Sequence, residues 1–179
     1  MNQANPASAT PPAAPAQNPK FWYGIRKIFL VWAILLLIGF GATHFYPAPR
    51  VNILWTILAL FGLGYMKSQL PFAQRAYRHI FLTWLIIIVL GLIISASSFY
   101  YPPLYFLLAY LGIFWLLLLG IGHLSTGLIT KRKKFYKTAL AHGIAAILIA
   151  MVPAFFGVQY LAAGVVASLS MVWLIVAKS

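Results

Sequence analysis

Six long apolar stretches, separated by short polar or Pro-rich turns, constrain this chain more than any other feature. They cover residues 28–45, 51–66, 80–99, 104–130, 139–156 and 158–177. A helix of about 20 apolar residues crosses the roughly 30 Å hydrocarbon core of a bilayer and pairs its own backbone N–H and C=O groups. We therefore expect an all-α fold, a polytopic transmembrane helical bundle with about six spans.

The rest of the chain divides into a tail and a single membrane domain. Residues 1–19 are rich in Pro, Ala, Asn and Gln and carry no charged side chain, so a disordered tail is expected. Residues 20–179 should form one transmembrane domain, because 63% of the chain is hydrophobic and only 7% is charged. Soluble domains carry about 25% charged residues. Short turns at 46–50, at 100–103 and at Gly157 should close three helical hairpins.

The positive charges predict an orientation for this bundle. The chain has 13 Lys and Arg and no Asp or Glu. Twelve of the 13 fall before the first stretch, in the connections after the second and fourth, or after the last, whereas Arg50 lies in the first turn. Because Lys and Arg are enriched in cytoplasmic loops, we expect both termini in the cytoplasm and the protein in the inner membrane of a bacterium.

The missing carboxylates and cysteines exclude most enzyme mechanisms. The chain has no acidic pair for acid–base catalysis, no Asp for a Ser-His-Asp triad and no thiolate. We therefore expect no catalytic residues. A nucleic-acid partner is also not expected, because the basic residues are spread over membrane-flanking loops without a recognised binding motif.

The excess of positive charge has two interpretations. It is the ordinary signature of cytoplasmic loops, or it binds anionic lipids or an acidic protein partner. The candidate residues for such contacts lie between the fourth and fifth stretches: Lys131, Arg132, Lys133, Lys134 and Lys137.

Two histidines inside apolar stretches form the candidate intramembrane site. His123 lies about two turns from the end of the fourth stretch and His142 about one turn into the fifth, so both fall in the cytoplasmic half. With Ser125 and Thr126, they predict a polar recess open to the cytoplasm, since ionisable groups within a membrane are candidates for function. The alternative is that each neutral imidazole only bonds a neighbouring helix.

The two histidines are also candidate cofactor ligands. Two imidazoles can hold a haem b iron as axial ligands, which makes haem an alternative. A metal centre is not expected, because no carboxylate or thiolate is present to complete a ligand set. The expectation is therefore no cofactor, with haem b as the alternative.

Small residues recur four positions apart in several stretches, a spacing that lets helices approach closely. The pairs include Gly39 with Thr43, Gly91 with Ser95, and Gly122 with Thr126. We expect packing within the monomer rather than oligomerisation, with the fifth and sixth stretches packed most tightly. A short similarity between residues 61–64 and 119–122 is a candidate internal repeat.

Three hypotheses for function follow. The first is a non-catalytic subunit or assembly factor of a larger inner-membrane complex. The second is a small permease or binding protein for an apolar or anionic molecule that uses the recess around His123 and His142. The third is a haem-binding redox subunit of the membrane.

Overall fold

The computed structural model describes residues 19–177, and side chains from residue 24 onward. Its long α-helices are α1 (Pro19–Phe45), α2 (Val51–Gln69), α3 (Arg75–Tyr100), α4 (Leu111–Thr130), α5 (Lys133–Met151) and α7 (Gln159–Val176). A 3-10 helix, η2 (Pro102–Tyr110), precedes α4, and a single turn, α6 (Pro153–Phe156), precedes α7. No strand occurs within residues 19–177. The tail that was predicted to be disordered, residues 1–19, lies outside the described residues except for Pro19. Lys178 also lies outside them.

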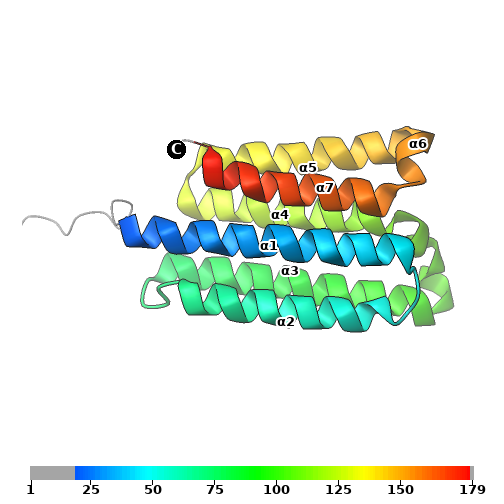
Figure 1. Cartoon of the computed structure of the whole chain (residues 1–179), viewed down its shortest axis with the longest axis horizontal. Coiled ribbons are helices and arrows are strands. Elements are labelled where there is room, and N and C mark those ends of the chain that lie inside the picture. Colours follow the sequence, from blue (N-terminus) through cyan, green and yellow to red (C-terminus); the bar gives the residue numbers. More distant parts are fainter. Residues whose placement is uncertain (1–18, 178–179) are drawn as a thin grey trace, which may run out of the picture.

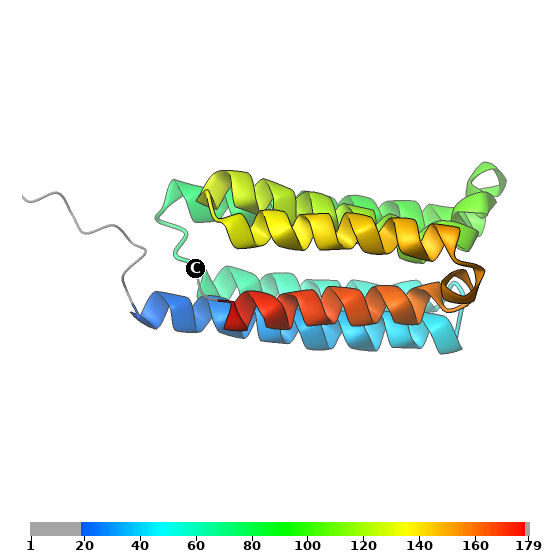
Figure 2. The same cartoon turned by 90° about the horizontal axis from the view of Figure 1, so that it is seen from above.

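The six long helices form two layers of three, visible in Figures 1 and 2. One layer contains α2, α1 and α7, and the other contains α3, α4 and α5. Their outward faces are apolar, and large side chains such as Leu60, Leu128 and Leu169 are more than half exposed. An apolar exterior of this kind is stable in lipid but not in water.

Five helical segments have the length and apolar composition of membrane spans: residues 24–45, α2, α3, η2 with α4, and α7. They indicate a multi-pass membrane protein. Helix α5 does not meet that criterion, because it begins with Lys133 and Lys134 and carries Lys137 one turn later. The fifth predicted span, 139–156, is therefore not established, whereas the sixth, 158–177, corresponds to α7.

Prolines move several predicted boundaries. The fourth stretch, 104–130, is not one α-helix, because Pro102 and Pro103 start η2 and α4 begins only at Leu111. The fifth stretch, 139–156, is interrupted at Pro153, which lacks an N–H and disfavours helical backbone in the residue before it. Val152 is accordingly extended, with φ −104° and ψ 109°. The last hairpin therefore closes over residues 152–158 rather than at Gly157 alone.

Four tryptophans pack between neighbouring helices and join α1 to α2 and α3 to α4. Each of these helices carries a Trp and, seven positions later, a Gly, and each indole packs on the Gly of its antiparallel neighbour. The contacts join Trp32 to Gly62, Trp55 to Gly39, Trp84 to Gly122 and Trp115 to Gly91. Because glycine has no Cβ, the rings reach the helix backbone.

Hydroxyl groups one turn after three of these glycines accept the indole N–H. Thr43 accepts from Trp55 at 2.9 Å, Ser95 from Trp115 at 3.0 Å and Thr126 from Trp84 at 3.1 Å. A buried methionine, Met66, takes the same position after Gly62. The α1–α2 and α3–α4 pairs thus repeat one packing pattern. In this pattern Gly62 of α2 corresponds to Gly122 of α4. The similarity between residues 61–64 and 119–122 instead matches Gly62 with Gly120, two residues earlier.

These small-residue pairs make contacts within the chain. The expectation that the fifth and sixth stretches pack most tightly is wrong. The most extensive helix contacts join α1 to α7 and α4 to α5, and those of α5 with α7 are much smaller. Gly120 lies close to His142 on α5, where a Cβ would stand 3.3 Å from that of the histidine. Small residues on α4 thus bring α5 close.

Candidate functional site

His123 of α4 and His142 of α5 lie next to each other inside the bundle. Their ring centroids are 5.1 Å apart and the rings are tilted by 46°. Both side chains are 0% exposed. The sequence placed the two imidazoles at similar depth, and the fold brings them into contact. They line no open surface, however, so they lie in an enclosed site rather than in a recess open to solvent.

The hydrogen bonding of the pair is incomplete. His142 Nδ1 lies 2.8 Å from the carbonyl oxygen of Thr138. A carbonyl only accepts, so Nδ1 carries the proton and the Nε2 of neutral His142 has a free lone pair. Neither that Nε2 nor either ring nitrogen of His123 has a hydrogen-bond partner among the described residues. Buried polar atoms are nearly always paired, which makes these three nitrogens exceptional.

Aromatic rings surround His123. Trp84 of α3 meets it in a T-shaped contact at 5.2 Å between ring centroids. Phe135 of α5 lies nearly parallel to it at 6.3 Å. Thr126 holds the Trp84 indole by accepting its N–H and donates its own hydroxyl to the Gly122 carbonyl at 2.8 Å. Thr126 is thus linked to the site through Trp84 rather than by contacting an imidazole.

Ser125 does not share this environment. Its side chain is half-buried, and none of the contacts described for His123 or His142 involves it. Of the four residues predicted for the intramembrane site, two form its centre and Thr126 supports it.

A haem does not fit between these two histidines. Two axial imidazoles must lie on opposite faces of the porphyrin, whereas the His123 and His142 rings contact each other directly. Trp84 and Phe135 occupy further sides of His123. Within the described residues there is also no group of three or more His, Cys, Asp or Glu side chains that could hold a metal ion.

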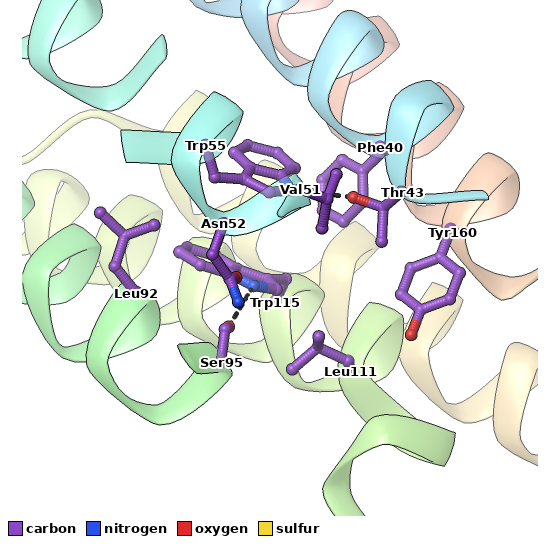
Figure 3. A pocket seen from close by; sticks show the side chains of 10 residues that line it. All are labelled: Phe40, Thr43, Val51, Asn52, Trp55, Leu92, Ser95, Leu111, Trp115 and Tyr160. Atoms are coloured by element: carbon purple, nitrogen blue, oxygen red, sulfur yellow. Dashed lines mark hydrogen bonds between the residues drawn. The ribbon is translucent and has the colours of Figure 1, made fainter. Parts of the chain in front are cut away.

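A small pocket with a mainly apolar lining lies in the opposite half of the bundle, where α1 ends and α2 and α4 begin (Figure 3). The Trp55 and Trp115 rings stack there at 5.7 Å with an interplanar angle of 10°. Asn52 Nδ2 is buried in the lining without a hydrogen-bond partner among the described residues. The free space is about 10 Å³, close to the volume that one water molecule needs.

This second pocket was not expected from the sequence. Its signals were present in the Gly39–Thr43 and Gly91–Ser95 spacings, which were interpreted as packing alone. The missing information was that a Trp from the neighbouring helix bonds each hydroxyl. That pairing depends on which helices are neighbours.

The basic residues gather at one end of the bundle, which we call the basic end. It comprises the start of α1, the α2–α3 and α4–α5 connections and the adjoining helix termini (Figure 1). Its exposed cationic side chains are Arg26, Lys27, Lys67, Arg75, Arg78, Lys131, Lys133 and Lys137. Arg50 lies at the other end, in the α1–α2 connection.

Two of the five predicted contact residues are less accessible. Lys134 is only 9% exposed, and its ammonium donates to the Leu174 carbonyl at 3.1 Å, near the end of α7. A cation there interacts favourably with the free carbonyls of a helix terminus. Burial lowers the pKa of Arg132, and nearby Tyr77 partly offsets that effect. The exposed contact residues are therefore Lys131, Lys133 and Lys137.

Comparisons of the chain with protein-family models, with curated proteins and with solved structures find no match. The class of protein thus follows from the fold itself, an all-helical, multi-pass membrane protein with a basic end and an enclosed histidine pair.

Proposed function

We propose that this protein is a non-catalytic subunit or assembly factor of a larger complex in a bacterial inner membrane. In this proposal all six long helices cross the bilayer, and both termini are cytoplasmic. The basic end is then the cytoplasmic face, in line with the enrichment of Lys and Arg in cytoplasmic loops. The lysines of α5 would lie at that interface and not in hydrocarbon.

The observation that carries the proposal is a cluster of exposed cations in a chain without any acidic side chain. The basic end exposes lysines and arginines from α1, α2, α3 and α5, and the sequence holds no Asp or Glu to pair with them. The compensating charge must therefore come from outside the chain. An acidic cytoplasmic surface of a protein partner supplies it with specificity, because complementary charge fixes partner and orientation.

Co-purification of the full-length protein from its own membranes tests this proposal. Lys131, Lys133 and Lys137 are exposed, so a triple Gln variant removes charge without disturbing a buried contact. If each rim charge contributes about 0.2–1 kcal/mol, the three together contribute about 0.6–3 kcal/mol, so recovery of the cross-linked partner should fall by about threefold to more than a hundredfold. The single variant Arg50→Gln, at the opposite end, is the matched control and should retain the partner.

Two results would contradict the proposal. One is recovery of the wild-type protein as a lone monomer in several mild detergents, with and without cross-linker. The other is a triple variant that loses co-purifying anionic lipid but retains every co-purifying protein.

A small permease or binding protein for an anionic or apolar molecule is the second candidate. Its support is that the histidine pair and the Asn52 pocket both adjoin α4 and both contain buried nitrogen atoms without a hydrogen-bond partner among the described residues. Buried Leu116 and Leu119 separate them along that helix. Uptake of acetate into proteoliposomes should be lost on replacing both His123 and His142 by Ala. Replacing His44 and His79 should leave it unchanged. Equal uptake by both double variants would rule out the histidine route.

A further inference from the structure

The His123–His142 pair has more capacity for hydrogen bonds than its surroundings use. In the neutral state His142 donates through Nδ1 and presents the Nε2 lone pair, and His123 has one N–H and one lone pair. Since no described residue bonds either nitrogen of His123, its ring is not fixed by a hydrogen bond. With 5.1 Å between the ring centroids, ring rotation can direct a His123 N–H toward the Nε2 of His142.

We propose that His123 and His142 form a proton-binding site that takes up one proton and shares it through an N–H···N bond between the two rings. The proton comes from water and adds to the remaining lone pair of His123. His123 then becomes an imidazolium that donates one N–H to His142 Nε2, and the site gains one positive charge. No other bond is made or broken.

Aromatic rings near His123 offset part of the cost of burying a cation there. The Trp84 ring, at 5.2 Å, is within the range in which an aromatic ring attracts a cation, and Phe135 lies close to that range at 6.3 Å. A second proton on His142 would place two positive charges in adjacent rings with no carboxylate in the chain to separate them. The pair is therefore limited to a single added proton.

The other charged or titratable groups on the packed helices lie toward the helix ends. They are Arg75, Tyr77, Arg78, His79 and Tyr100 on α3, Lys133, Lys134, Tyr136 and Lys137 on α5, and Tyr160 on α7. Helix α4 has none besides His123. Lys137, just over one turn before His142, is exposed, and the Lys134 ammonium donates to the Leu174 carbonyl. The imidazoles are thus each other's closest titratable contacts.

Full burial gives proton uptake a conformational consequence. Both imidazoles are 0% exposed, so a proton reaches them only when α4, α5 or a neighbouring helix opens transiently. The site does not depend on the proposed partner and can be measured in the isolated protein. In the second candidate function, it would supply the coupling ion.

Nitrogen NMR of the full-length protein in nanodiscs, labelled with ¹⁵N at histidine and kept in EDTA to exclude metals, tests the inference. The chain has only four histidines, and the variants His44→Gln and His79→Gln identify the signals outside the site. At high pH His142 should show the Nδ1–H form. As pH falls, both rings of the site should change at one common midpoint, with a total uptake of one proton.

The variant His142→Gln should lower the proton affinity of His123 at least tenfold, whereas His79→Gln should not change it. If His142→Gln does not fold, the wild-type spectra alone test whether the two rings share one midpoint and one proton. The inference is overturned if both rings stay neutral down to the pH of unfolding, or if each takes up its own proton at an independent midpoint.

Discussion

At the scale of single residues, the fit of tryptophan rings against glycine decides how closely the helices approach. Gly122 and its acceptor Thr126 hold Trp84, and Trp84 in turn contacts His123. The sequence showed the four-residue spacing of Gly122 and Thr126 and correctly indicated close packing. It did not show that an indole fills the space, because Trp84 lies on another helix.

Replacing Gly122 by Ala should destabilise the protein. A Cβ there would lie 2.7 Å from the Trp84 ring, so the ring must move and strain its bond to Thr126. Overpacking of this kind costs about 1–3 kcal/mol. The measurement is the free energy of unfolding in detergent.

Gly143→Ala on α5 is the matched control, because no neighbouring helix among the described residues comes within 4 Å of the point where its Cβ would stand. It should leave stability unchanged or raise it by up to about 1 kcal/mol, the difference in helix propensity between Gly and Ala. Equal losses in the two variants would show that Trp84 is not tightly fitted against Gly122.

At the scale of elements, α5 is the helix whose relation to the membrane most needs a direct test. It carries more lysines than the other long helices within the described residues, yet it packs extensively on α4 and holds His142 inside the bundle. Its lysines occupy only the first turns, from which long side chains can reach the interface. We therefore expect α5 to span the bilayer with Lys133 on the cytoplasmic side.

Single cysteines can test this topology, because the chain has none of its own. In right-side-out vesicles, an impermeant maleimide should label Ala154→Cys after α5 and the reference Tyr46→Cys. It should label Lys133→Cys only after the vesicles are opened. All three positions are exposed, so burial does not prevent reaction. Labelling of positions 133 and 154 from the same side would mean that α5 does not cross.

At the scale of the whole molecule, the chain closes on itself by packing its first helix against its last. The α1–α7 contact is among the most extensive in the bundle, and Ser168 of α7 donates to the Ala33 carbonyl of α1 at 2.8 Å. Gln159 joins the layers at the other end, bonding the Ala109 carbonyl at 2.6 Å and the Gly112 N–H at 3.1 Å. The first bond ties α7 to α1, and the Gln159 bonds tie α7 to the start of α4.

The sequence by itself determined the class of fold, because runs of apolar residues in a chain with so few charges are stable only as helices in lipid. It also placed His123 and His142 at similar depth and located the cationic clusters. Only the tertiary structure decided that the two imidazoles touch, that Lys134 turns inward and that four of the indoles each meet a glycine. Those outcomes depend on which helices are neighbours, and hydrophobic runs of similar length do not encode that choice locally.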